Sequence, residues 1–166
     1  MEQRMRDAAT ALAERLVERA SDKVVFAESC TAGLISAAMA GVPGISQFLC
    51  GSFVTYREAA KQEMLNVPPE LIRKHTAVSR EVTEVMATNS LKRTEEATWS
   101  TAITGHLGPG VEDELDGKIF VAIAKRENGN VDLQSCEMFR LTAASRLERQ
   151  QEAAAIAIEQ LKQTLS

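Results

Sequence analysis

The stretch that decides the fold is Lys23-Val24-Val25-Phe26-Ala27-Glu28-Ser29-Cys30-Thr31-Ala32-Gly33-Leu34-Ile35. Its opening residues, 23–27, are mostly β-branched or aromatic and predict a short, fully buried strand. A polar turn follows, and the small apolar residues of 31–40 predict a helix that ends at Gly41-Val42-Pro43-Gly44. A buried strand that passes through a turn into a helix is a building unit of layered α/β folds.

The rest of the chain continues this alternation of helix and strand. Helices are predicted over 2–20, from 57 to before Pro68, over 80–92 with Ser79 as the cap, and over 145–165. Strands are predicted over 48–56, 98–104, 118–125 and 131–139, the last at an edge. The turn Glu127-Asn128-Gly129-Asn130 makes the last two strands an antiparallel hairpin. We therefore expect an α/β protein with ligands at the strand ends.

Length and composition are those of an ordinary globular protein. The 166 residues correspond to one domain, 1–166, and 45% apolar with 25% charged residues excludes disordered and fibrous classes. The net charge of −4, from 19 basic and 23 acidic residues, gives no surplus for a nucleic-acid partner. No apolar run approaches the roughly 20 residues of a membrane span. The N-terminal residues lack the apolar core of a signal peptide, so no membrane partner is expected.

The cysteines and histidines predict neither a disulfide framework nor a metal site. Cys30, Cys50 and Cys136 are odd in number and widely spaced, and only His75 and His106 accompany them. We therefore expect a reduced, cytoplasmic protein without a bound metal.

The turn after the first strand presents three side chains that can carry chemistry. Ser29, Cys30 and Thr31 stand where a helix begins, beside N–H groups that suit an anion or a developing oxyanion. Two plainer interpretations remain open. Ser29 or Thr31 is a simple helix cap, or Cys30 is a small buried apolar residue rather than a nucleophile.

A second set of polar residues follows the strand over 48–56. Tyr56 ends that strand and Lys61 comes little more than one helical turn later, so both can lie at one edge of the sheet. A desolvated lysine loses its proton near neutral pH and can serve as a base toward a serine hydroxyl. The plainer alternative is that Lys61 is a solvated surface lysine.

The loop Thr104-Gly105-His106-Leu107-Gly108-Pro109-Gly110 is the third candidate segment. Its glycines permit close approach of a ligand, although the pattern matches no nucleoside-triphosphate motif. Two interpretations remain open: the loop binds a phosphate or carboxylate, or it is an ordinary tight connection between strands. Arg146 and Arg149 can reach a phosphate, and for Arg149 we favour pairing with an acid such as Glu152.

Taken together, these segments resemble the CinA C-terminal domain family in its stand-alone form, and the match covers nearly the whole chain in the same order. The matching residues are Ala27-Glu28-Ser29-Cys30-Thr31 with Gly33, Pro43-Gly44 through Ser46 and Phe48, Phe53-Val54-Thr55-Tyr56 with Lys61, Ala77-Val78-Ser79 with Met86-Ala87, and Thr104-Gly105 with Gly108-Pro109. The combination is specific, whereas each motif alone is weak.

This resemblance implies a three-layer α/β/α sandwich with a mixed sheet and an amidohydrolase activity. The enzymatic members deamidate nicotinamide mononucleotide to nicotinate mononucleotide and ammonia, and no cofactor is implied. By likeness, Ser29 is the nucleophile and Lys61 its base, while Tyr56 and Ser46 assist proton transfer and positioning. The pyridine nucleotide would contact residues at the matching positions Thr31, Gly33, Thr104, Gly105, Gly108 and Arg146.

The chain departs from the family pattern mainly in one loop. The family's Gly-Ile-Ala-Gly-Pro is Gly105-His106-Leu107-Gly108-Pro109 here, and an acidic stretch, 111–117, follows it. Added carboxylates would weaken phosphate binding by repulsion. A second family arginine is replaced by Gln150. The alternatives are thus a non-catalytic nucleotide-binding module of the same fold, or hydrolysis of another amide or ester. The Ala-rich last helix also suggests a possible homo-oligomer.

Overall fold

A five-stranded mixed sheet forms the middle of the molecule in the computed structural model, which describes residues 2–166. The strands are β1 (Val24–Glu28), β2 (Leu49–Val54), β3 (Trp99–Gly105), β4 (Lys118–Glu127) and β5 (Asn130–Arg140), in the spatial order β2-β1-β3-β4-β5. β1 pairs in parallel with β2 and β3, whereas β3, β4 and β5 pair antiparallel. The predicted antiparallel hairpin and the edge position of its last strand are confirmed.

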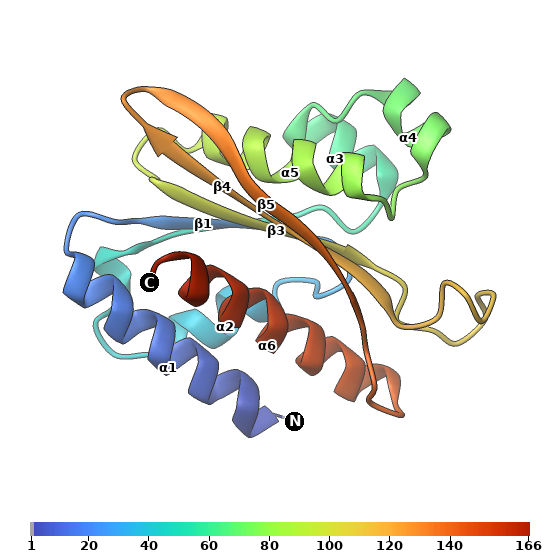
Figure 1. Ribbon diagram of the computed structural model, residues 1–166, viewed down its shortest axis with the longest axis horizontal. Coiled ribbons are helices and arrows are strands. Elements are labelled where there is room, and N and C mark those ends of the chain that lie inside the picture. The colour runs from blue at the N-terminus through green and yellow to red at the C-terminus, as the bar shows by residue number, and fades with distance from the viewer. Residues whose placement is uncertain (1) are drawn as a thin grey trace.

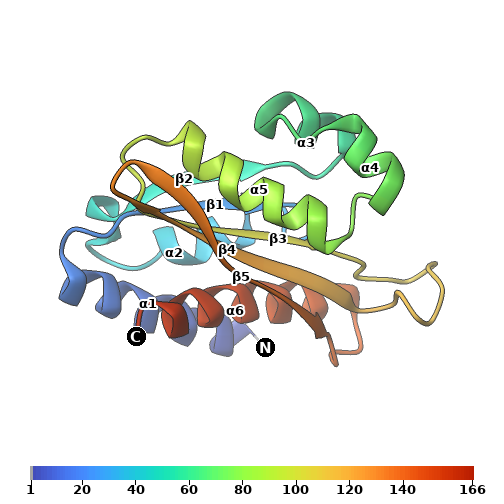
Figure 2. The same cartoon turned by 45° about the horizontal axis from the view of Figure 1, so that its top comes forward.

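Helices cover both faces of this sheet (Figures 1 and 2). The first layer consists of α1 (Glu2–Arg19), α2 (Leu34–Ala40) and α6 (Arg146–Thr164), and the second of α3 (Glu58–Leu65), α4 (Pro69–His75) and α5 (Arg80–Arg93). A short 3₁₀ helix, η1 (Ile45–Gln47), precedes β2. The α/β fold expected from the sequence is confirmed, with the sheet between two layers of helices.

Two apolar cores, one on each face, hold the layers together. Alternate residues of β1 enter different cores: Phe26 packs in the core beneath α1, α2 and α6, while Val25 and Ala27 pack beneath α5. This alternation follows from the period of two along a strand. Because both faces are covered, every residue of β1 is buried, including the carboxylate of Glu28 at its end.

Two local predictions need correction. Pro68-Pro69 is expected only to end a helix, yet Pro69 also begins α4, because proline fits the first turn, where its missing N–H is not needed. α2 begins at Leu34 rather than Thr31, since Ala32 and Gly33 have positive φ values of 53° and 93°. The Ala-rich face of α6 lies inside this chain, against α1 and the sheet.

The helices of residues 2–166 include none with the length and apolar character needed to cross a membrane.

Candidate active site

The carboxyl ends of β1 and β2 bring a serine and a lysine into direct contact. Ser29 follows β1, and its N–H donates to the carbonyl oxygen of Ile103 in β3 at 3.1 Å. Lys61 lies on α3, which begins just after β2. The Nζ atom of Lys61 lies 2.8 Å from Ser29 Oγ and 2.7 Å from the carbonyl oxygen of Thr55. Two residues that are 32 positions apart in sequence therefore form one hydrogen-bonded pair.

The lysine of this pair is buried. Only 1% of Lys61 is exposed, so the interpretation as a solvated surface lysine is wrong. Burial lowers the pKa of the Lys61 ammonium from 10.5 to about 8, because the charged form loses its hydration. Neighbouring Cys30 and Glu58 oppose this change only in part. The amine thus becomes neutral within reach of physiological pH, as a base toward a hydroxyl must.

The N-terminus of α2 is filled by Glu28 and is not open to an external anion. The Glu28 carboxylate accepts 3.0 Å hydrogen bonds from the N–H groups of Gly33, Ile35 and Ser36, and a fourth from the Ser52 hydroxyl. The expectation that these N–H groups await an anion is therefore wrong. The alternative that Ser29 or Thr31 caps the helix is also wrong, because no side chain of the turn itself caps it.

Cys30 is a buried apolar residue. It is 5% exposed, and burial raises the pKa of its thiol to about 12. A thiol with this pKa stays protonated at neutral pH and is a poor nucleophile. Of the two candidate nucleophiles in the turn, Ser29 is therefore the one with a partner suited to activate it.

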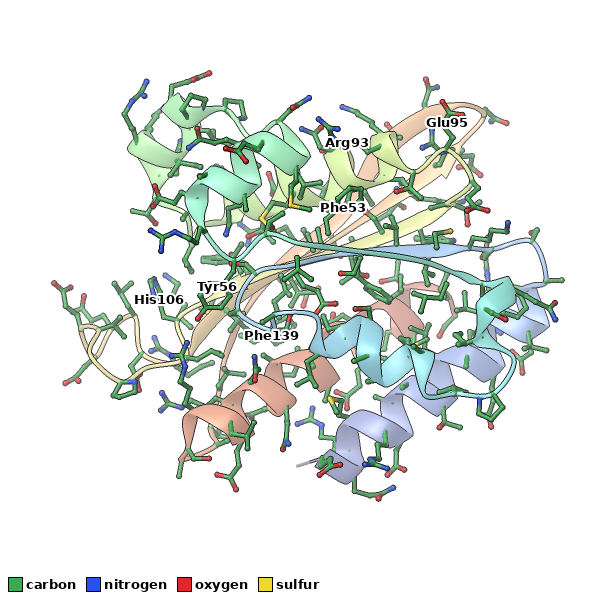
Figure 3. The ribbon with its side chains drawn as sticks, turned by 180° about the vertical axis from the view of Figure 1, so that it is seen from behind. Phe53, Tyr56, Arg93, Glu95, His106 and Phe139 are labelled. Carbon is green, nitrogen blue, oxygen red and sulfur yellow. The ribbon has the colours of Figure 1, made fainter. Side chains whose placement is uncertain are left out.

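Arg146, at the start of α6, connects the segment after β2 with the loop after β3. The hydroxyl oxygen of Tyr56 accepts a 3.0 Å hydrogen bond from Arg146, which also donates to the carbonyl oxygen of Gly108. Figure 3 shows Tyr56 and His106 at the same end of the sheet. Tyr56 is 53% exposed, whereas Ser29 and Lys61 are buried.

A polar pocket of about 480 Å³ opens next to Arg146. It is lined by Leu107, Pro109, Gly110, Val111, Asp113, Asp116, Ala144, Arg146 and Arg149. Two acidic and two basic side chains share this lining, which gives the pocket mixed charge. Arg146 of this lining donates to the Tyr56 hydroxyl, and Tyr56 follows Thr55, whose carbonyl oxygen accepts from Lys61.

Arg149 does not pair with Glu152 as the sequence suggested. Its guanidinium donates to Asp116 at 2.7 Å, and this hydrogen bond holds the pKa of the Asp116 carboxyl below its usual value. Glu152 is buried and accepts from the N–H groups of Thr142 and Ala143 instead. Arg140 donates to three carbonyl oxygens of the acidic stretch 111–117, so arginines secure this loop.

Ser46 is not part of this site. It lies in η1, exposed and ahead of β2, while Ser29 and Lys61 lie at the other end of that strand. A strand of six residues separates them, which is about 20 Å. The carry-over of Ser46 from the family is not supported by this position.

Four other residues that are expected to contact substrate are instead engaged within the protein's own structure. Gly33 donates its N–H to Glu28, and the Thr104 hydroxyl lies 2.7 Å from that of Thr83 inside the protein. A side chain at Gly105 would collide with Ile119. Thr31 is completely buried, and its hydroxyl has no partner among residues 2–166. Gly108 and Arg146 are the two residues of the expected set that lie at the polar pocket or contact its lining.

Two residues that the sequence analysis did not assign also shape the site. Glu28 is the first, and its signal was a lone carboxylate at the end of a run of buried apolar residues. Gln150 is the second: its side-chain amide donates to the carbonyl oxygens of Cys30 and Thr31 at 3.3 and 3.1 Å. Gln150 thereby ties the turn that carries Ser29 to α6.

The fold is that of an α/β protein that brings Ser29 and Lys61 together at the carboxyl ends of β1 and β2. The sequence profile of the CinA C-terminal domain matches residues 6–165. A CinA-like protein of Prochlorococcus marinus subsp. pastoris is 42% identical over 115 residues, which are 68% of this chain and 26% of that protein. The chain spans about a quarter of the length of the first curated relatives that it matches.

Similar solved structures also belong to CinA and competence/damage-inducible proteins. The competence/damage inducible protein CihA of Agrobacterium tumefaciens is 34% identical, with a TM-score of 0.83 over 95% of both chains. A CinA superfamily protein of Escherichia coli is 27% identical, with a TM-score of 0.84 over 96% of this chain and 90% of that one. The chain belongs to the CinA C-terminal domain family.

Proposed function

We propose that this protein is an amidohydrolase that deamidates nicotinamide mononucleotide to nicotinate mononucleotide and ammonia. The observation that carries the proposal is the buried contact of 2.8 Å between Lys61 Nζ and Ser29 Oγ. A hydroxyl beside an amine with a lowered pKa is the arrangement of Ser–Lys hydrolases. The mononucleotide as substrate, by contrast, follows from the family resemblance alone.

In the proposed first half-reaction, neutral Lys61 Nζ takes the hydroxyl proton as Ser29 Oγ bonds to the carboxamide carbon. The tetrahedral intermediate then breaks its C–N bond, and Lys61 returns the proton to the leaving nitrogen, which departs as ammonia. In the second half, water attacks the resulting ester while Lys61 takes its proton. Lys61 then passes that proton to Ser29 Oγ as the acid leaves. Each proton thus moves through a single amine.

The intermediate needs a donor for its negative oxygen, and the turn offers one. The N–H group of Cys30 donates to no main-chain carbonyl in the described part of the chain, residues 2–166. We assign the oxyanion to this N–H group, because Thr31 is fully buried and the N–H groups of Gly33, Ile35 and Ser36 already serve Glu28. Arg146 and the adjoining polar pocket would hold the nucleotide phosphate, with Tyr56 at the mouth.

A non-catalytic nucleotide-binding module is the second candidate. The observation in its favour is the polar pocket itself, because Arg146 and Arg149 can hold a phosphate there, whereas Ser29 and Lys61 do not line it. In this case the mononucleotide would bind without turnover.

One assay separates the two candidates. Purified protein is incubated with nicotinamide mononucleotide, ammonia release is measured, and Ser29→Ala is the matched control. Release that depends on Ser29 is the expected result. A melting temperature that rises with the mononucleotide while no ammonia appears would favour the binding module. Release from other amides or esters, with none from the mononucleotide, would retain the serine chemistry and replace the substrate.

A further inference from the structure

The Glu28 carboxylate is fully buried and only accepts hydrogen bonds. Its Oε2 accepts from the N–H groups of Gly33 and Ile35, and its Oε1 from Ser36 N–H and the Ser52 hydroxyl. The residue is 0% exposed, and the ion pairs found among residues 2–166 do not include it. Four hydrogen-bond donors, three of them at the N-terminus of α2, thus stabilise the negative charge in place of a basic side chain.

This carboxylate joins the turn that carries Ser29 to β2, the strand that leads toward α3 and Lys61. On one side it fixes the turn over 29–33, because three N–H groups at the start of α2 converge on it. On the other side it contacts Ser52 in β2. Glu28 also accepts the N–H of Thr55 with its own carbonyl oxygen at 2.8 Å, and the carbonyl oxygen of Thr55 is the second acceptor of Lys61.

We propose that Glu28 is a positioning residue that sets the distance between Ser29 Oγ and Lys61 Nζ. The proposal rests on the proposed function, since it presumes that this pair performs the chemistry. Glu28 does not touch the reacting atoms. It acts through the turn that holds Ser29 and through β2, which leads to Thr55, the main-chain acceptor of Lys61. A misplacement of about 1 Å between reacting groups can cost about 100-fold in rate.

Glu28→Gln tests the role with almost no change in shape. A glutamine has one acceptor oxygen and one NH₂ group, so it cannot accept from all four donors. If its NH₂ faces Gly33 and Ile35, two N–H groups lose their acceptor. If it faces Ser36 and Ser52, the Ser52 hydroxyl can rotate to accept, but the Ser36 N–H cannot. In the first orientation the turn over 29–33 loses its hydrogen bond to this side chain, and in the second the start of α2 loses one.

Glu152→Gln is the matched control. Glu152 is also buried, 4% exposed, and its carboxylate accepts two N–H groups and the hydroxyl of Thr142. It secures the segment before α6 and has no contact with Ser29 or Lys61. Comparable loss of melting temperature in the two variants would show that any difference in reactivity does not arise from stability.

The measurement is the rate at which a fluorophosphonate modifies Ser29, followed by mass spectrometry from pH 6 to pH 10. In this step Ser29 Oγ bonds to phosphorus, fluoride leaves, and Lys61 takes the proton. We expect the wild-type rate to increase with a midpoint near pH 8. Glu28→Gln should be slower by about 30-fold and lose this midpoint, whereas Glu152→Gln should stay within about twofold. A folded Glu28→Gln labelled at the wild-type rate would overturn the proposal.

A second pair of variants decides the question if Glu28→Gln does not fold. Ser52→Ala removes only the link to β2, and we expect labelling about fivefold slower. Ser135→Ala is its control, because Ser135 is likewise half-buried on a strand but lies on β5, without contact to Glu28 or the turn. Equal rates for both variants and the wild type would refute the positioning role.

The probe also separates the two proposals. If the wild type is labelled at Ser29 but releases no ammonia from the mononucleotide, only the substrate assignment fails. If the wild type is not labelled at any pH, the Ser29–Lys61 chemistry and the role of Glu28 fail together.

Discussion

The turn after β1 and the loop after β3 leave the same end of the sheet from neighbouring strands, yet they are built differently. The first turn is secured by Glu28, a carboxylate with no exposed surface that serves four donors. The second, over 106–117, extends beyond the sheet (Figure 1) and is secured by arginines on its surface. The two segments therefore share a position in the fold, but buried hydrogen bonds hold the first and surface arginine contacts hold the second.

Under the proposed function, this difference separates reactivity, at the turn after β1, from recognition, at the loop after β3. Buried hydrogen bonds tolerate little displacement and are barely affected by salt, so the turn suits the placement of Ser29. The ion pair between Arg149 and Asp116 is partly exposed and therefore weakened by salt. The charge of the loop over 106–117 can therefore change without displacing Ser29 and Lys61. The acidic stretch 111–117 is consistent with this separation between the loop and the pair.

The largest effect is expected at the buried pair. Ser29→Ala and Lys61→Met should each lower kcat by about 1,000-fold or more, because one removes the attacking oxygen and the other its proton acceptor. Lys74→Met, at an exposed lysine on α4, is the control and should leave kcat unchanged. Deamidation assays on folded variants provide the measurement. A Lys61→Met enzyme within tenfold of the wild type would assign the base elsewhere.

The next effect is the dependence of the rate on pH. Lys61 is a base only when neutral, and burial lowers its pKa to about 8. The rate should therefore rise about tenfold per pH unit below pH 8 and level off above it. Initial rates of ammonia release between pH 6 and pH 10 give the profile. A rate that falls over this range would require the protonated amine, and the assignment of Lys61 as base would be wrong.

A smaller effect is expected where the two segments meet. Arg146 donates to Tyr56 beside the reactive pair and to Gly108 in the loop after β3. Arg146→Ala should raise KM for the mononucleotide about tenfold and change kcat by less than about threefold, because a phosphate contact outside the reacting bond is lost. Arg93→Ala, at the far end of α5, is the control. A loss confined to kcat would instead place Arg146 in the chemical step.

The sequence predicts the reactive turn better than its surroundings, for physical reasons. A buried strand, a turn and a helix leave a periodic signal, and Lys61, little more than one helical turn after Tyr56, indicates the correct sheet edge. The contact of Glu28 with Ser52 joins residues 24 positions apart and leaves no such signal. Ser46 follows α2, which carries the chain away from the motif, and β2 separates Ser46 from the sheet end where Lys61 lies.

For the loop after β3, the sequence shows which residues are charged but not which residues they contact. Its charges are obvious in the sequence, but their partners are not, because a long arginine side chain can reach several acids at similar cost. Arg149 has Glu152 three residues away on its own helix and still pairs with Asp116, 33 positions earlier. Glu152 is unavailable because backbone N–H groups occupy it. Local spacing therefore misleads wherever a buried backbone group competes for the same carboxylate.

The smallest predicted effect tests whether the acidic loop tunes recognition alone. Asp116→Asn removes the partner of Arg149 and one negative charge from the pocket, so KM for the mononucleotide should fall about threefold at low salt. The gain should shrink as salt approaches 0.5 M, while kcat and the pH profile stay unchanged, since Ser29 and Lys61 do not contact the loop. Asp113→Asn is the matched control, because it lines the same pocket without an ion pair to Arg149. Steady-state kinetics at two salt concentrations measure all of these quantities. A change in kcat comparable to that in KM would mean that loop and turn act as one unit, and the separation of recognition from reactivity would have to be abandoned.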